Sequence, residues 1–153
     1  MIEIDAKTAQ STLDRLARIN KDVEQKMNDF LNKESKILET KIKQELTKVK
    51  GVDTGQARNS IHGEVERMEG RVKANALHAS IIEYGRRPGK FPPIEPIRRW
   101  VQRKGLNIPA FVVARKIAVS GVAPRPFFYP TWTNYKGTFN RKLIALFKQI
   151  VQK

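Results

Sequence analysis

The residues GVDTGQARNSI (51–61) separate two parts of the chain that follow different sequence patterns. The 50 residues before them contain neither glycine nor proline, whereas these eleven contain two glycines, an Asp-Thr pair and a Ser-Ile ending. Three interpretations fit this change: a flexible linker, a catalytic or phosphate-binding loop, and a structural turn between a helix and a sheet. A phosphate loop of the Walker type requires the pattern G-x-x-x-x-G-K-[ST], which this stretch lacks.

A structural turn explains this stretch best. Gly51 follows the preceding helical pattern, and glycine is a frequent residue at the C-terminal cap of a helix. Asp53 stands three residues before Gln56, the spacing of a capping box in which a side chain accepts hydrogen bonds from free backbone N–H groups. We therefore predict a helix that is closed by Gly51, a short helix over residues 54–60 and a strand that begins at Ile61.

The residues before the turn predict one long amphipathic helix, from about Asp5 to Val49. Apolar residues recur at intervals typical of one helical face. They are Leu13, Leu16, Val23, Met27, Phe30 and Ile37, followed by Leu38, Ile42, Leu46 and Val49. Such a helix would extend roughly 65 Å, more than the diameter of a domain of this size. Either it breaks near residues 33–36, where the stripe shifts, or part of it packs on a neighbouring subunit, which would make the protein an oligomer.

The residues after the turn predict a small antiparallel sheet. SIHGEVER (60–67) and RVKANAL (71–77) flank Met68, Glu69 and Gly70, a loop compatible with a β-hairpin. Ile61, Val65 and Val72 are expected on its buried face.

Short helices are predicted to follow the sheet. HASIIEYG (78–85) is a strand or short helix that ends at Gly85, and RRPGKFPP (86–93) is a loop. IEPIRRWVQRKG (94–105) predicts a helix with Ile94, Ile97, Trp100 and Val101 inward. IPAFVVARKIAVSG (108–121) predicts an apolar helix with Pro109 at its start, and residues 134–153 predict an amphipathic one. The fold class is α+β: a long N-terminal helix, a small antiparallel sheet, two short middle helices and a C-terminal helix. One domain covers 1–153, with the helix in 1–50 and an α+β body in 51–153.

The charge of the chain is unevenly distributed. The net charge is +15, but residues 1–50 carry 11 basic and 9 acidic side chains, whereas residues 51–153 carry 19 and 6. No acidic residue follows Glu95, against twelve Lys and Arg. Such a field favours a polyanion, an acidic protein or an anionic membrane surface as partner, and a merely solvated basic face explains it as well.

Catalytic and metal-binding patterns are weak. The chain has no cysteine, which excludes disulfides and thiolate chemistry. His62, Glu64 and Glu66 alternate and could share one strand face, but one histidine with two surface carboxylates is a poor metal site. Neither a G-x-S-x-G motif nor a Ser-His-Asp order is present. We expect no enzyme activity and no cofactor.

The densest basic cluster lies in the middle of the chain. It consists of Arg86, Arg87, Lys90, Arg98, Arg99, Arg103 and Lys104, and we call it the basic cluster. The helices around it resemble a helix-turn-helix in order, but the second helix offers mostly apolar side chains, with only Arg115 and Lys116, so sequence-specific DNA reading is not expected. Contact with DNA phosphates and contact with an acidic partner remain equally open.

Three motifs in order resemble those of a family of tailed-phage neck proteins, the tail-completion or head–tail joining components of long-tailed phages. The first motif is matched by Asp53, Thr54, Gly55, Arg58, Ser60 and Ile61, the second by Ile82, Glu83, Tyr84 and Gly85, and the third by Pro124, Arg125, Pro126, Phe127 and Phe128. The match spans about residues 5–150. It departs from the family in His78-Ala79, where Tyr-Ala is frequent, and in Gly51, where proline is common.

The resemblance implies a non-enzymatic structural protein of the virion neck, made in the cytoplasm of a bacterial host. Members of the family usually form rings, commonly sixfold, that meet the tail tube or tail terminator and the head connector. Partners would thus be further copies of the chain, these tail and connector proteins and, where the ring encloses the channel, phage DNA, with no membrane. Trp100 and the Pro-Arg-Pro-Phe-Phe segment would serve as anchors in a core or an interface. The alternative function is a basic nucleic-acid-binding module that acts alone.

Overall fold

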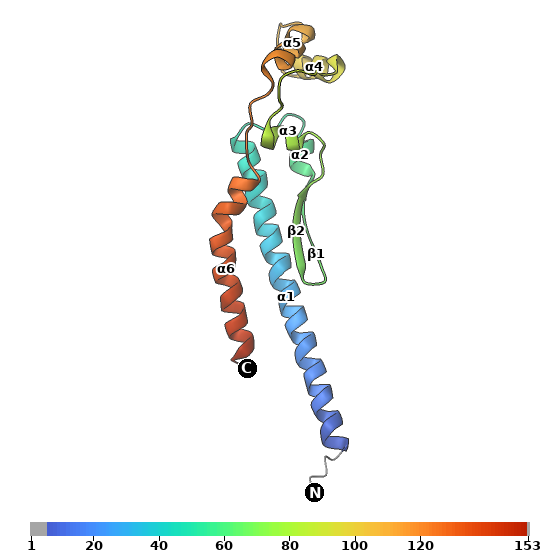
Figure 1. Ribbon diagram of the computed structural model, residues 1–153, viewed down its shortest axis with the longest axis vertical. Coiled ribbons are helices and arrows are strands. Elements are labelled where there is room, and N and C mark those ends of the chain that lie inside the picture. Colours follow the sequence, from blue (N-terminus) through green and yellow to red (C-terminus); the bar gives the residue numbers. More distant parts are fainter. Residues whose placement is uncertain (1–5, 153) are drawn as a thin grey trace.

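The long helix of the structure is unbroken. The computed structural model describes residues 6–152, with side chains at Asp14 and from residue 17 onward. Helix α1 (Ala6–Lys48) has 43 residues, and its C-terminal part carries the other elements (Figure 1). Of the two alternatives for this helix, the break near residues 33–36 is excluded, because the helix continues through them. The predicted start at Asp5 and the side chains of Leu13 and Leu16 lie outside what the structure describes.

Two partners pack on adjoining faces of α1, which explains why its apolar stripe shifts without a break. A hairpin of β1 (Ile61–Glu66) and β2 (Glu69–Ala74) covers one face, and α6 (Tyr129–Val151) lies along another (Figure 1). The buried side chains of α1 are Leu31, Glu34, Ser35, Leu38, Glu39, Ile42 and Leu46. The N-terminal end of α1 extends past both partners (Figure 1), and the side chains of residues 17–22 are exposed.

Helix α1 ends in a left-handed residue, but this residue is Lys50 rather than the predicted Gly51. Lys50 has φ of 54°, and the N–H of Gly51 donates a 3.0 Å hydrogen bond to the carbonyl of Leu46. A side chain at Gly51 would have to displace Leu46, since a Cβ atom there would lie 2.5 Å from Cδ1 of Leu46. The predicted helical cap is therefore found one residue earlier.

The hairpin is the only sheet in the described part of the chain. Its antiparallel register runs from Ile61 opposite Ala74 to Glu66 opposite Glu69. The turn consists of Arg67 and Met68, which both have positive φ, as a two-residue type I′ turn requires. The predicted loop at 68–70 is shifted, because Glu69 and Gly70 already pair in β2. The predicted buried face is confirmed: Ile61 is buried, and Val65 and Val72 are half-buried.

Helices α4 (Ile94–Arg103) and α5 (Ala110–Ser120) pack together at one end of the molecule (Figure 1). Two connecting segments join these helices to the rest of the molecule. The two segments are hydrogen-bonded to each other at Arg86 and Val122, where each N–H donates to the other residue's carbonyl, at 2.9 and 2.8 Å. Val101 is buried, and Ile94, Ile97 and Trp100 are half-buried, which confirms the predicted inward face of α4.

The core lies where α1, the hairpin and the start of α6 meet. Its buried residues are Leu38, Ile42, Leu46, Ala57, Ile61, Ala79, Phe127 and Tyr135. Two very short helices, α2 (Gln56–Asn59) and α3 (Ala79–Tyr84), supply Ala57 and Ala79, so HASIIEYG forms the short helix of the two alternatives. The fold is α+β, as predicted, and the structure shows that it is mostly helical.

Candidate functional site

The carboxylate of Glu83 joins the second motif to the third. One oxygen accepts hydrogen bonds from the backbone N–H groups of Phe127 and Phe128, at 2.7 and 2.8 Å, and the other accepts from Tyr129 at 2.9 Å. The side chain of Glu83 is buried, and these three N–H groups precede or begin helix α6. A carboxylate suits this position because it satisfies N–H groups that have no partner within the helix and complements the positive end of the helix dipole.

The third motif also contacts the second motif and the residues just before the first. The N–H of Arg125 donates to the carbonyl of Ile82 at 2.7 Å, and its guanidinium donates to the carbonyl of Lys50 at 3.1 Å. Gly85 has φ of 73°, and a Cβ atom there would overlap the carbonyl oxygen of Val122. Only glycine therefore allows the two connecting segments to lie this close.

Asp53 does not cap helix α2, contrary to the capping-box prediction. The residue before this helix is Gly55, and no side chain caps it. Asp53 instead pairs with Arg103 and, at 3.4 Å, with Lys104 at the end of α4. The hydrogen bond from Arg103 keeps the pKa of Asp53 below its usual value. An acidic residue in this turn thus fastens the α4–α5 pair to the end of α1.

The other residues of the first motif shape the turn. Gly55 has φ of 83°, a left-handed conformation that glycine adopts without strain. The hydroxyl of Ser60 donates to the carbonyl of Ala57 at 2.8 Å and accepts from the N–H of Ala76 at 3.0 Å. Thr54 lies beside the N–H of Gln56, at the 3.5 Å limit of a hydrogen bond, and Arg58 is exposed.

The basic cluster lies on α4 and on the segment before it. Four of its cations contact carboxylates: Arg98 and Arg99 pair with Glu95, and Arg103 and Lys104 pair with Asp53. Arg86 donates to the carbonyl of Lys90 at 2.6 Å. Within residues 6–152, Arg87 and Lys90 form no ion pair, and both are exposed. Arg87 and Lys90 are therefore the cations of the cluster whose side chains contact neither a carboxylate nor a carbonyl among the described residues.

The predicted anchors divide between core and surface. Phe127 is fully buried, and its ring lies edge-on to the half-buried ring of Phe128 at a centroid distance of 6.3 Å. Pro124, Arg125 and Pro126 are exposed. Trp100 is half-buried and lines a hollow together with the turn at Asp53 and Gly55. Tyr84 is exposed, so the second motif offers one aromatic ring to solvent.

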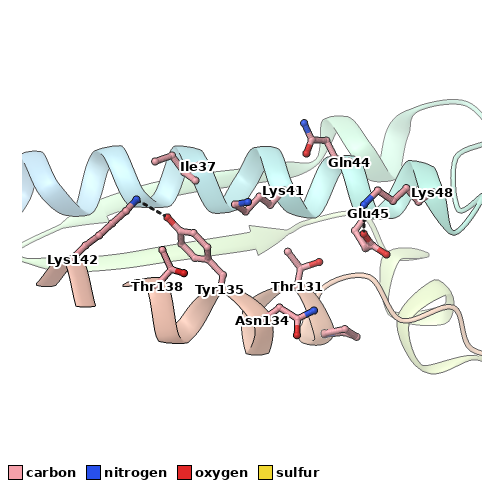
Figure 2. Close-up of a pocket in the computed structure, with 11 residues that line it drawn as sticks. Ile37, Lys41, Gln44, Glu45, Lys48, Thr131, Asn134, Tyr135, Thr138 and Lys142 are labelled. Atoms are coloured by element: carbon pink, nitrogen blue, oxygen red, sulfur yellow. Dashed lines mark hydrogen bonds and ion pairs between the residues drawn. The ribbon is translucent and has the colours of Figure 1, made fainter. Parts of the chain in front are cut away.

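The prediction missed a buried polar contact between α1 and α6. Glu34 is 3% exposed, accepts from the hydroxyl of Tyr135 and pairs with Lys142 at 2.9 Å. Figure 2 shows the Tyr135–Lys142 contact at one end of a cavity of about 490 Å³. Burial and the hydrogen bond with Glu34 raise the pKa of Tyr135. The signal in the sequence was Glu34 itself, which lies on the apolar stripe three residues after Leu31.

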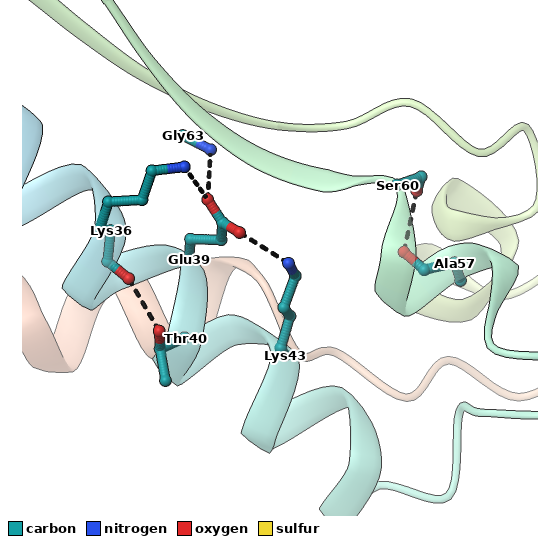
Figure 3. A network of polar contacts seen from close by, with 7 residues as sticks. All are labelled: Lys36, Glu39, Thr40, Lys43, Ala57, Ser60 and Gly63. Carbon is teal, nitrogen blue, oxygen red and sulfur yellow. Dashed lines mark hydrogen bonds and ion pairs between the residues drawn. The ribbon is translucent and has the colours of Figure 1, made fainter.

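A second missed carboxylate fixes the hairpin to α1 (Figure 3). Glu39 accepts from the backbone N–H of Gly63 at 2.8 Å and pairs with Lys43 at 2.6 Å and Lys36 at 3.1 Å. Burial alone would raise the pKa of Glu39, but the hydrogen bonds from Lys43, Gly63 and Lys36 outweigh it and lower the pKa to about 2. Only the favourable spacing of Glu39 and Lys43 was visible in the sequence.

The described residues offer neither a metal site nor a membrane-spanning helix. They contain no group of three or more His, Asp or Glu side chains placed to hold a metal ion. His62, Glu64 and Glu66 are exposed on the hairpin, and Glu64 pairs with Lys73. None of the described helices combines the length and the apolar character needed to cross a bilayer.

Comparison of the chain with models of protein families, with curated proteins and with solved structures gave no match in any of the three.

Proposed function

We propose that this protein is a non-enzymatic structural component of a tailed-phage neck, which completes the head-proximal end of the tail and joins it to the head connector. In this role several copies surround the tail axis, and the surface of each copy carries the binding specificity. The partners are further copies of the chain, the tail tube or tail terminator, and the connector.

One observation carries the proposal: residues of the three ordered motifs lie close together in space, and Asp53 and Gly55 of the first, Ile82 of the second and Arg125 of the third line one hollow. Glu83 binds the backbone of Phe127, and Arg125 reaches the carbonyl of Lys50 next to the first motif. The motifs are therefore linked in space as well as in order. The residues that carry the resemblance to neck proteins are thus residues that hold one part of the fold together.

The projecting end of α1 supports assembly with neighbours. Its side chains 17–22 are exposed, and Ile19, which continues the apolar stripe, is 50% exposed. A helix that leaves apolar residues uncovered is stabilised by a surface that covers them. This agrees with the second of the two alternatives for the long helix, packing on a neighbouring subunit.

The alternative, a nucleic-acid-binding module that acts alone, would depend on the basic cluster. Four of its seven cations share two carboxylates, Asp53 and Glu95, so these acids offset only part of its positive charge. Phosphate binding uses this kind of charge, and the salt dependence of DNA affinity measures how many cations take part. We propose that the remaining charge at Arg87 and Lys90 meets either DNA in the channel or an acidic partner surface.

The test is complementation of head–tail joining. In a phage or prophage that encodes this chain, deletion of its gene should give separate heads and tails, and the purified chain should restore infectious particles when added to that lysate. Ile19→Asp should restore far fewer, whereas Asn20→Asp, which adds the same charge to a neighbouring exposed position, should act as the wild type does. Infectious particles in the lysate without the chain would contradict the proposal.

A further inference from the structure

The outer edge of β2 is an open strand edge above a groove. Two hollows of about 250 and 440 Å³ follow each other along β2 and share Val72 and Phe128 in their walls. Helix α1 forms the floor of the first with Leu31 and Leu38, and α6 forms the opposite wall with Trp132 and Phe139. The groove is therefore elongated and parallel to a strand, and its walls are mainly apolar but also contain the carboxylates of Glu34 and Glu83, which are bound to partners within the chain.

The backbone of β2 offers hydrogen-bonding groups to this groove. In a hairpin with a two-residue turn, the pair next to the turn is hydrogen-bonded and alternate pairs are not. Glu66 and Glu69 form that pair, so the N–H and C=O groups of Gly70, Val72 and Ala74 point away from β1. By the same alternation, the N–H of Gly63 on β1 points away from β2, and it donates a hydrogen bond to Glu39. In the described part of the chain, the N–H groups of Gly70, Val72 and Ala74 have no acceptor outside the hairpin.

The side chains of β2 specify what kind of strand fits this edge. Val72 and Ala74 pack on the core, whereas Arg71 and Lys73 are exposed on the outer face. In a strand added beside β2, the side chains that face the core lie next to Val72 and Ala74 and should be apolar. The side chains that face outward lie next to Arg71 and Lys73 and should be acidic. Arg71 and Lys73 already contact Glu69 and Glu64, but exposed pairs of this kind are weak, so a further carboxylate can share the cations. A like-charged strand, including a second β2, is disfavoured.

The chain contains one five-residue segment with this pattern outside the hairpin. Residues 1–5 read Met-Ile-Glu-Ile-Asp, with apolar side chains at Ile2 and Ile4 and acidic ones at Glu3 and Asp5. The open edge from Gly70 to Ala74 has the same length. The C-terminal part of the chain cannot supply such a segment, because no acidic residue follows Glu95.

The segment cannot reach the groove of its own copy. It precedes Ala6 at the N-terminal end of α1, and the groove begins at Leu31, 25 residues further along an unbroken helix. That distance is roughly 38 Å at 1.5 Å per residue, whereas five extended residues span at most about 18 Å. Figure 1 shows the N-terminal end of α1 well away from the hairpin.

We propose that residues 1–5 of one copy add as a third strand to the free edge of β2 in a second copy, with Ile2 and Ile4 in the groove and Glu3 and Asp5 beside Arg71 and Lys73. This is β-augmentation, in which main-chain hydrogen bonds give affinity and alternate side chains give specificity. The contact is heterologous, so repeating it builds a ring or a filament. The inference rests on the self-association within the proposed function and names the contact that would produce it.

The absence of cysteine allows a direct test by disulfide crosslinking. Glu3→Cys in a tagged copy is mixed with Lys73→Cys or Arg71→Cys in an untagged copy and oxidised. We expect a covalent tagged–untagged dimer with at least one of these two partners. The matched control is Lys148→Cys, an exposed cation near the end of α6, which should not crosslink to Glu3→Cys. A yield no higher than in this control would overturn the contact.

Sedimentation of the purified full-length chain provides the second measurement. The wild type should self-associate, and the double variant Ile2→Asp, Ile4→Asp should raise the dissociation constant at least about tenfold while its circular dichroism spectrum stays unchanged. A wild type that is monomeric at its solubility limit, or association that survives the double variant, would overturn the inference. Neither measurement involves the phage. If the crosslink does not form but the chain still joins heads to tails, only this contact is refuted. If the crosslink forms but the chain is not needed for head–tail joining, only the proposed function is refuted.

Discussion

The carboxylate of Glu83 accepts a 2.7 Å hydrogen bond from the backbone N–H of Phe127, a residue 44 positions further along the chain. Phe127 is fully buried, and helix α6 begins two residues later. This contact joins a short helix in the middle of the chain to the start of the C-terminal helix. The same arrangement brings the second and third sequence motifs together.

Replacement of Glu83 by alanine should destabilise the protein by about 3 kcal/mol, because three N–H groups at the start of α6 lose a buried charged acceptor. Glu83→Gln, which keeps one acceptor oxygen, should cost less. The free energy of unfolding in urea measures both. Ser80→Ala changes an exposed residue of the same helix and should stay within about 0.5 kcal/mol of the wild type. Equal stability of Glu83→Ala and the wild type would refute the role given to Glu83.

Replacement of Gly55 by valine should destabilise the protein by about 2 kcal/mol, because a β-branched residue is strained at φ of 83°. The control is Gly137→Ala. Gly137 lies within α6, and a Cβ atom there meets nothing within 4 Å. Alanine should stabilise the helix by about 0.5–1 kcal/mol. Thermal or urea unfolding measures both changes, and a Gly55→Val protein as stable as the wild type would show that the turn can be rebuilt without glycine.

Stability should fall in acid through Glu39. Its folded pKa is about 2, below the unfolded value of 4.5, so its contribution is present above pH 4.5 and is lost as the pH falls toward 2. We expect this contribution to be on the order of 2 kcal/mol. Glu39→Gln should flatten the pH dependence of the unfolding free energy between pH 4.5 and 2. Glu45→Gln, which alters a pair with Lys48 on the same helix, should leave it nearly unchanged. If Glu39→Gln left the pH dependence of the unfolding free energy unchanged, groups other than Glu39 would be responsible for the loss of stability in acid.

The charge at Arg87 and Lys90 can be tested with non-specific double-stranded DNA. If these cations bind phosphates, Arg87→Gln with Lys90→Gln should weaken binding and lower the slope of log affinity against log salt by about 2, or about 1 for each cation removed. Lys148→Gln should leave the slope unchanged. An unchanged slope in the double variant would favour an acidic protein as the partner of these residues.

The helices, the hairpin and the core faces could be predicted from sequence because they depend on local periodicity. The turn at residues 51–56 was predicted as a turn, but its contacts were not. Asp53 and Gln56 have the spacing of a capping box, yet the charge of Arg103, 50 residues away, provides Asp53 with a stronger partner. Local spacing does not reveal such a partner.

Buried carboxylates account for most of what the sequence did not reveal. Glu34 and Glu83 are each satisfied by groups more than 40 residues away, and in Glu83 the donors are backbone N–H groups, which any residue type except proline provides. Glu34 could have been suspected, since it falls on the apolar stripe of α1. The long helix was predicted, but the sequence left open whether it breaks near residues 33–36. The shift of the stripe reflects two different partners, the hairpin and α6, and neither is visible from the spacing alone.

The most direct test of the proposed function is the structure of the assembled neck, determined by electron cryomicroscopy of particles from a phage or prophage that encodes this chain. The proposal predicts several copies of the chain arranged around the axis between the tail tube and the head connector, with the N-terminal part of α1 packed on a neighbouring copy. Particles whose neck contains no density for the chain, or a chain found only outside the virion, would contradict it.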